Sequence, residues 1–231
     1  MAKYGKNLLL PFAVLLSFFP LLDPLEIFSD LKITSFDTFQ TIFPRPKLEE
    51  DPVIIVDIDD ESLQKIGQWP WSRDVLASLT DQTQLAAATA FDIVFAEPDR
   101  TGSSQLQKIY SNDEALVEIL SRTVDHDDVF AQSIANHGTV VLGLAPNNKT
   151  ENQNYLGKHG MVIQGDDPKL FVQPYIGMQN NLNILESESA GLGSMSIGND
   201  DVIVRTLPSF ENINGSLVPS LALEIVRVAI G

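Results

Sequence analysis

Two aspartates spaced two residues apart are the first side chains in this sequence that could do chemistry. Asp57 and Asp59 end the β-branched run that begins at Val53. Residues two apart on a strand point to the same face, so the two carboxylates would lie together. Such a pair could hold Mg²⁺, or could act as a nucleophile and an acid on a phosphate ester. In the structural alternative, Asp59 or Asp60 caps the following helix and Asp57 pairs with Arg73.

The residues that would complete a magnesium phosphohydrolase are not recognisable around this pair. The spacing is similar to the Asp-x-Asp pattern of haloacid-dehalogenase-type phosphatases, which also need a Thr or Ser at a strand end, a Lys and a second acidic pair. No convincing set of these groups appears in the sequence. We therefore expect no catalytic residue, and a phosphohydrolase based on Asp57 and Asp59 is the alternative function.

A rigid pair of indoles follows the aspartates. Pro70 lies between Trp69 and Trp71, and proline fixes its own backbone angle, which holds both rings close to one geometry. The two rings could form one wall of a ligand pocket. They could equally fill the space between the end of a strand and the start of a helix.

Arg73 likewise has two interpretations. Its guanidinium could clamp an anionic ligand through two parallel hydrogen bonds. Alternatively it pairs with Asp57 or Asp92, because an unpaired buried charge is costly. Asp92 lies inside the otherwise apolar segment 88–95, and Glu97 lies at its exit, so both acids join the candidate site.

Other metal-compatible or nucleotide-compatible motifs are weak. Asp125-His126-Asp127-Asp128 has neither the spacing of an EF-hand nor a histidine pair, and we expect a solvated turn there. Gly191-x-Gly193 lacks the third glycine of a dinucleotide site and indicates a tight strand. We expect neither a metal nor a cofactor.

Composition excludes several classes of protein. The 231 residues are enough for one large domain with an appendage. A formal net charge of −16 argues against nucleic acid and against docking on anionic lipid. The chain contains no cysteine, which removes disulfides, thiolate metal sites and cysteine nucleophiles, and weakly favours an extracytoplasmic bacterial protein.

The N-terminus has the charge pattern of a membrane anchor. Lys3 and Lys6 precede an uncharged run over residues 8–22, and Asp23 follows it. Residues 1–23 are therefore predicted to be a transmembrane anchor, with a cleaved signal and a buried core helix as alternatives. The positive-inside rule keeps the N-terminus in the cytoplasm and places the rest of the chain outside. Apolar residues at helical spacing predict an amphipathic juxtamembrane stalk over residues 24–46, which packs on the domain or on a partner stalk.

Residues 47–231 are predicted to form one α/β domain with a mixed β-sheet flanked by helices. Strands are expected at 53–58, 88–95 and 139–144, and a helix that starts at Ser72 and carries Leu85 on its inner stripe should link the first two in a right-handed crossover. Asp60 or Ser62 should open a short helix that Gly67 closes. The remaining expectations are a loop at 102–111, helices at 115–120 and 129–134, loop with short strands at 162–183, paired strands at 191–197 and 202–210, a hairpin at Asn214-Gly215 and a last helix at 221–230.

Several of these segments together resemble the type-two CHASE family (cyclases/histidine kinases associated sensory extracellular domains). They are Asp57 to Leu63, Gly67 to Arg73, Phe91 to Pro98, Asp200 to Arg205 and Pro219 to Ala222. The Trp-Pro-Trp core is specific, whereas the usual Asp-Gly of the acidic turn is replaced by Asp201-Val202. The resemblance covers most of the chain after the anchor.

The resemblance implies a sensor. It would be the extracytoplasmic domain of a bacterial inner-membrane receptor, in the periplasm or outside the cell. It would bind an unknown small ligand or a periplasmic protein and signal to a cytoplasmic cyclase or kinase that this chain does not contain. The expected partners are the membrane, through the N-terminal helix, and a second copy of the chain in a homodimer.

Overall fold

The computed structural model describes residues 27–44, 46, 52–149, 155, 157–158, 160–197 and 204–231. The chain divides into two compact units, Met1–Ile58 and Asp59–Gly231. The predicted anchor at 1–23 and the acidic turn at Asp200 and Asp201 lie outside the described residues. Among the residues described, no helix is both long and apolar enough to cross a membrane.

The first unit contains one described helix, α2 (Ile27–Ile42). It lies inside the predicted stalk, where the apolar residues recur at helical spacing. The predicted strand at 53–58 is wrong: residues 53–59 form no strand, and Ile54 and Ile55 are each 86% exposed. Hydrophobic, β-branched sequence favours a strand only where a neighbouring strand takes up its backbone groups, and Ile54, Ile55 and Val56 have no described strand partner.

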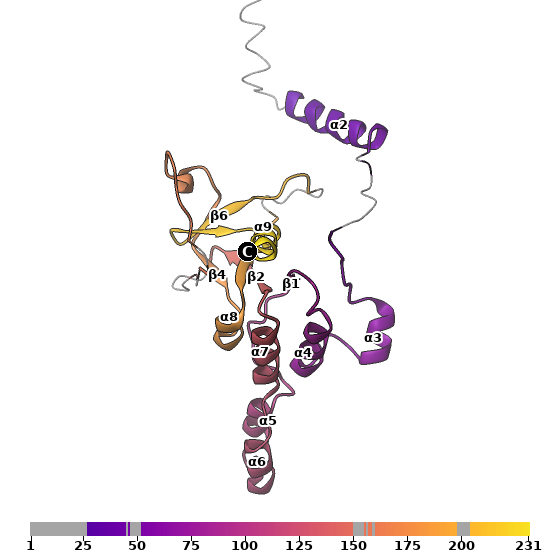
Figure 1. Cartoon of the computed structure of the whole chain (residues 1–231), viewed down its shortest axis with the longest axis vertical. Coiled ribbons are helices and arrows are strands. Elements are labelled where there is room, and N and C mark those ends of the chain that lie inside the picture. The colour runs from indigo at the N-terminus through magenta and orange to yellow at the C-terminus, as the bar shows by residue number, and fades with distance from the viewer. Residues whose placement is uncertain are drawn as a thin grey trace, which may run out of the picture. The chain divides into compact units, whose positions relative to one another are not determined.

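The second unit is built on a mixed sheet (Figure 1). Its central strand β2 (Val140–Asn147) pairs in parallel with β1 (Thr89–Phe91) and with β5 (Gly191–Ser194). The far end of β2 pairs antiparallel with β4 (Gly177–Gln179). Residues 140–144 are all buried, as the continuous apolar run requires, because helices cover both faces of a parallel sheet. The predicted mixed sheet flanked by helices is thus confirmed.

A smaller sheet follows in the C-terminal part of this unit. Strand β6 (Phe210–Ile213) pairs antiparallel with β7 (Ser216–Pro219) and parallel with β3 (Pro174–Tyr175). The predicted hairpin at Asn214-Gly215 is confirmed, because both residues have positive φ, 47° and 80°. The predicted pairing of 191–197 with 202–210 is wrong for the described residues, since β5 pairs with β2 and residues 204–209 form no strand.

Eight helical segments complete the described part of this unit. Helices α4 and α7 pack on each other, α7 also contacts α8, and α9 contacts β5, β2 and β1. Their bounds are α3 (Asp60–Ile66), α4 (Arg73–Gln82), α5 (Ser103–Ile109), α6 (Glu114–Ser121), α7 (His126–His137), the 3-10 turn η1 (Pro168–Leu170), α8 (Asn183–Glu188) and α9 (Leu221–Ile230).

The predicted helices at 115–120, 129–134 and 221–230 are confirmed, and so is the irregular segment 162–183 with its short strands. The expected loop at 102–111 is instead mostly α5. Leu85 does not lie on the inner stripe of α4, because that helix ends at Gln82 and leaves Leu85 fully exposed.

The predicted strand at 88–95 is shortened to β1, which ends at Phe91. The chain then turns so that Phe91 and Phe95 both pack edge-to-face against Phe130 of α7, with ring centroids 5.6 and 5.3 Å from it. This aromatic triangle forms part of the core between the sheet and α7. It also holds in place the segment that follows β1, and this segment leads to the candidate functional site.

Candidate functional site

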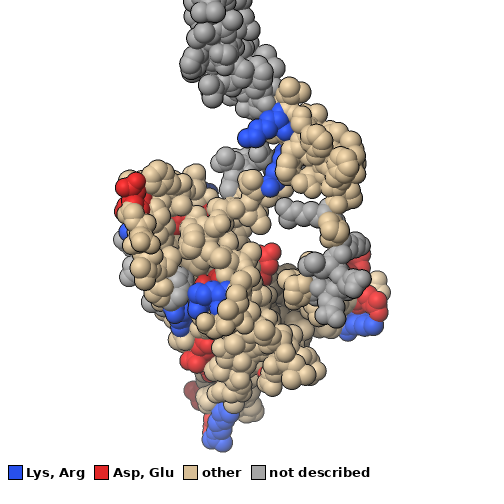
Figure 2. All heavy atoms as spheres, turned by 45° about the horizontal axis from the view of Figure 1, so that its top comes forward, with Lys and Arg blue, Asp and Glu red and all other residues tan. Residues whose placement is uncertain are grey.

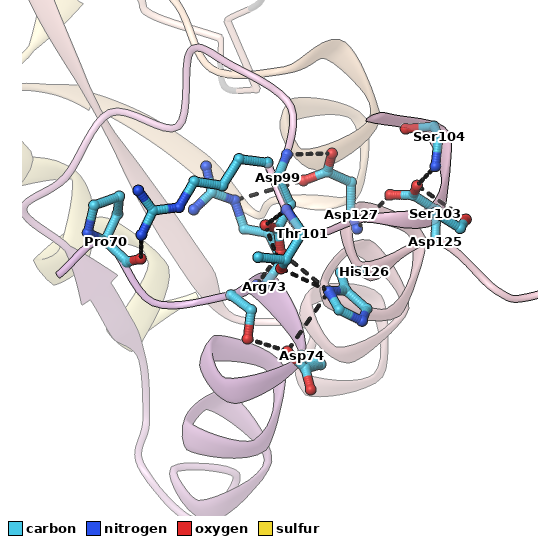
Figure 3. A network of polar contacts seen from close by, with 12 residues as sticks. Pro70, Arg73, Asp74, Asp99, Thr101, Ser103, Ser104, Asp125, His126 and Asp127 are labelled. Carbon is cyan, nitrogen blue, oxygen red and sulfur yellow. Dashed lines mark hydrogen bonds and ion pairs between the residues drawn. The ribbon is translucent and has the colours of Figure 1, made fainter. Parts of the chain in front are cut away.

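Arg73 is the first residue of α4 and is buried at 8% exposure. Its backbone N–H donates to Asp99 Oδ2 at 2.6 Å, and its Nε lies 3.5 Å from Asp127 Oδ1. Its guanidinium lies over the ring of Phe95, 4.6 Å from the centroid. We call Arg73, Asp99 and Asp127 the Arg73 cluster; Figure 3 shows it with the polar residues around it.

Asp99 connects the loop after β1 to two helices. Its Oδ1 accepts from both the backbone N–H and the hydroxyl of Thr101, while Oδ2 accepts from Arg73. Burial acts to raise the pKa of Asp99, but the hydrogen bonds from Arg73 and Thr101 outweigh it, so the pKa lies below its usual value. Asp99 is therefore a buried carboxylate that its neighbours keep ionised.

Asp127 lies in the first turn of α7 and accepts from the backbone N–H of Asp99 at 3.0 Å. Here burial dominates and raises the pKa of Asp127, although the Asp99 hydrogen bond and the charge of Arg73 oppose it. The expectation of a solvated turn at 125–128 is wrong for this residue, which is only 7% exposed. A first-turn aspartate that faces the interior can serve both the helix dipole and a buried cation.

Two more side chains of this segment surround the cluster. Asp125 is the N-cap of α7 and also accepts from Ser104 N at 2.7 Å, which joins α7 to the start of α5. His126 Nδ1 lies 3.3 Å from Asp99 Oδ2 and 3.8 Å from Asp74 Oδ1. A protonated His126 would thus add a second cation between α4 and α7.

The Trp-Pro-Trp turn lies directly before α4. Trp71 is buried and donates from Nε1 to Gly67 O at 2.7 Å, so it fills the space between α3 and α4. Trp69 packs edge-on against Trp71, with centroids 5.8 Å apart, but remains 37% exposed. The Trp69–Pro70 peptide is cis, and Arg100 Nη2 donates to Pro70 O at 3.4 Å. Trp71 is therefore structural, whereas part of the Trp69 ring is accessible from solvent.

Phe95 connects the Arg73 cluster to the sheet. Its ring lies under the Arg73 guanidinium. The backbone N–H of Phe95 donates to Asn181 Oδ1 at 2.7 Å, and Asn181 Nδ2 donates to Gly143 O in β2 at 2.9 Å. Glu186 Oε1 accepts from Asn181 N at 3.0 Å, while its Oε2 has no hydrogen-bond partner among the described residues. Burial raises the pKa of Glu186 in spite of the Asn181 hydrogen bonds.

Two further glutamates, Glu211 and Glu224, are buried in the second unit. Glu224 of α9 forms a bidentate pair with Arg227, at 2.8 and 2.9 Å. Glu211 of β6 accepts from the hydroxyl of Ser194 at the end of β5. Gly191 is needed here, because a Cβ on it would lie 2.3 Å from Glu224 Oε1, so the Gly-x-Gly motif serves close packing of α9.

The structure brings together only part of the predicted site. Trp69 and Trp71 pack on each other just before α4, whereas Asp92 is exposed and Arg73 faces Asp127 instead. The pairing of Arg73 with Asp57, which belongs to the other unit, stays a prediction. Glu97 is also exposed, and it contributes only its backbone carbonyl, which accepts from Arg73 Nη2 at 3.2 Å. Asp59 is the N-cap of α3 and accepts from Ser62 N at 2.8 Å, which agrees with its structural alternative.

The true partners, Asp99 and Asp127, were missed. The inward position of Asp127 could have been recognised from the sequence, because this residue lies one helical turn before the buried apolar residues of α7. Among the described residues, no group of three or more His, Asp or Glu side chains is arranged to hold a metal ion.

Comparison with known proteins identifies the class. The family model of the CHASE2 domain matches residues 10–230, so the chain belongs to the CHASE2 family. This is a family of extracellular sensory domains, and the predicted resemblance is confirmed. No curated protein and no solved structure matches the chain.

Proposed function

We propose that this chain is the extracytoplasmic sensing domain of a bacterial transmembrane receptor that signals to a cytoplasmic cyclase or kinase. The observation that carries the proposal is the match to a sensory family over nearly the whole chain. The expected location in the periplasm, held by an N-terminal anchor in the inner membrane, belongs to the same proposal. So does the absence of catalysis, because the alternative based on Asp57 and Asp59 has no second observation in its favour.

The Arg73 cluster supplies a physical route for a signal. It joins the first turns of α4 and α7 to the loop after β1, and Phe95 continues that connection to β2. Buried charge pairs can adopt only a few discrete arrangements. A ligand that bound beside this cluster could therefore switch it to another arrangement and shift one helix against the other. Trp69 is the proposed contact residue, since its ring is partly exposed in the turn that leads into α4.

The formal net charge of −16 argues against a nucleic-acid or anionic-polymer partner. On the face shown in Figure 2, the lysines and arginines form separate spots and not one continuous patch. We therefore propose a small ligand or a periplasmic protein as the stimulus.

Thermal unfolding in the presence of a metabolite panel tests the proposal, because a ligand of the native state raises the unfolding midpoint in a saturable way. The two tryptophans then locate the site by fluorescence. With any compound that stabilises the protein, Trp69→Phe should remove the change in emission, whereas the matched control Trp71→Phe should retain it. Magnesium-dependent phosphate release that Asp57→Asn abolished, with the fold intact, would instead establish the enzyme.

A further inference from the structure

His126 begins α7 and lies where that helix meets the first turn of α4 and the loop after β1 (Figure 3). Its Nδ1 atom lies 3.3 Å from Asp99 Oδ2 in the loop and 3.8 Å from Asp74 Oδ1 in α4. The hydroxyl oxygen of Thr101 lies 3.3 Å from the same nitrogen. One ring nitrogen therefore faces two carboxylates that belong to two different elements.

The acceptors define where the ring of His126 carries its hydrogen. An ionised carboxylate only accepts hydrogen bonds, so the Nδ1 atom that faces Asp99 is the one that carries the N–H in the neutral ring. A second proton then enters at Nε2 and gives the ring a full positive charge beside both carboxylates. The contact with Asp99 becomes an ion pair. Histidine is the side chain whose ordinary titration falls between about pH 5 and pH 8.

Asp99 remains an anion over that range of pH. Burial acts to raise the pKa of Asp99, but the hydrogen bonds from Arg73 and Thr101, together with the charge of a protonated His126, hold it below its usual value. The ring therefore gains its proton while Asp99 is still ionised. A proton that reaches this site is taken up by the imidazole and attracts a carboxylate that is already charged.

The first turn of α4 is the part that a charged ring can move. The side chain of Asp74 is 49% exposed, and its carboxylate accepts from the hydroxyl of Ser72 in the same turn. Its 3.8 Å separation from Nδ1 is longer than a hydrogen bond, so attraction can shorten it. Asp99, in contrast, is buried and already binds the backbone N–H of Arg73. Protonation of His126 should therefore shift the start of α4 relative to α7.

Other charges near the ring are engaged with different partners. The charged residues that the three elements bring close to His126 are Asp74 and Arg73 of α4, Asp99 and Arg100 of the loop, and Asp125, Asp127 and Asp128 of α7. Arg73 faces Asp127, and Arg100 donates to Pro70 O. The positive end of the α7 dipole opposes a charge on the ring, and the aspartates in the first turn of α7 offset it.

We propose that His126 is a proton-binding site, and that acid is a stimulus to which this domain responds by moving the first turn of α4. This inference rests on the proposed sensing role and names a stimulus for it. His137, at the other end of α7, provides the contrast within one helix. Its ring nitrogens lie 3.0 Å from Thr83 O and 3.1 Å from Thr139 Oγ1, which are uncharged groups.

Tryptophan emission can report the movement, because the chain has two tryptophans and both directly precede α4. In the full chain in detergent micelles, emission should change in one transition between about pH 5 and pH 8. His126→Gln should remove the transition, because an amide does not titrate, whereas the matched control His137→Gln should retain it. Emission that does not change in the parent, a transition that persists in His126→Gln, or one that a metal chelator removes, would overturn the proposal.

A double-mutant cycle tests whether the proton couples α7 to α4. Thermal unfolding midpoints are compared for the parent, His126→Gln, Asp74→Asn and the double variant at about pH 5 and about pH 8. At the lower pH the combined loss should be smaller than the sum of the single losses, because either change breaks the same contact. At the higher pH the losses should add. The pH dependence that arises from Glu186 is common to all four proteins and cancels. Equal coupling at both pH values would contradict a proton-linked contact.

Failure of this proposal can be distinguished from failure of the sensing role. If emission does not respond to pH, but a metabolite raises the unfolding midpoint in a saturable way, the domain senses a different stimulus and the proton site is wrong. If the transition at His126 is found in a chain whose periplasmic reporter is silent, the proton site stands and the extracytoplasmic role is lost.

Discussion

Arg73 is held by its backbone and by its side chain through different partners, so one residue fixes the start of α4 in two directions. The backbone N–H is bound by Asp99 of the loop, and the guanidinium faces Asp127 of α7 and the ring of Phe95. A buried ion pair of this kind adds little net stability. Removing its cation is much more destabilising, because a buried carboxylate is then left unpaired.

Replacing Arg73 by alanine should therefore destabilise the fold by about 3–5 kcal/mol. Arg73→Lys should recover only part of this, since an ammonium cannot contact Asp127, Glu97 O and Phe95 together. Urea unfolding measures both values. Arg122→Ala is the control: its pair with Glu118 is exposed, so its loss should cost less than about 1 kcal/mol. Equal effects of Arg73→Ala and Arg122→Ala would show that the cluster is not structural.

Glu186 makes the stability of the domain depend on pH. Burial raises the folded-state pKa of Glu186 above the ordinary value of 4.5. The contribution of this carboxyl group to the free energy of unfolding is therefore fully present below pH 4.5, and it is lost as the pH rises through the raised pKa. Asp127, whose pKa is also raised by burial, acts in the same direction. Unfolding free energies should therefore fall from pH 4.5 toward neutrality, and Glu186→Gln should flatten the curve, because the amide does not ionise. If Glu186→Gln kept the parent's dependence of unfolding free energy on pH, the fall in stability would be due to Asp127 alone.

At the scale of elements, the sequence predicted those segments whose signal is local. The hairpin at Asn214-Gly215 follows from two positive-φ positions, and α9 follows from its apolar spacing after the cap Ser220. The segment 53–58 failed, because its β-branched run becomes a strand only with a neighbour that local sequence does not specify. The partners of Arg73 could not be read from local sequence either, since Asp99 lies 26 residues after Arg73 and Asp127 lies a further 28 residues along the chain.

Hydrogen exchange can test the unpaired state of residues 54–56. Their amides have no described backbone partner, so they should exchange at rates close to those of an unfolded chain. The amides of β2, in the centre of the sheet, should be strongly protected and provide the internal control. Protection of residues 54–56 comparable to β2 would show that this segment is a strand in solution.

The contact between β5 and α9 makes a separate prediction. Gly191→Ala places a methyl group against the Glu224 carboxylate and should cost about 1–3 kcal/mol through overpacking. Gly160→Ala is the matched change at a position where a Cβ meets no atom within 4 Å, and it should be close to neutral. Thermal unfolding midpoints decide between them, and a neutral Gly191→Ala would mean that α9 shifts easily on the sheet.

At the scale of the whole molecule, the proposed receptor depends on where the domain lies relative to the membrane. Lys3 and Lys6 before the uncharged run, and Asp23 after it, are expected to keep the N-terminus in the cytoplasm. A periplasm-specific reporter fused after Gly231 should therefore be active, and a reporter that works only in the cytoplasm should be silent. Because the lysines carry the orientation signal, replacing both by glutamate should reduce periplasmic activity, whereas Lys65→Glu and Lys108→Glu, far from the run, should not. An active cytoplasmic reporter in the parent chain would remove the extracytoplasmic role and leave the family's sensory fold in a different compartment.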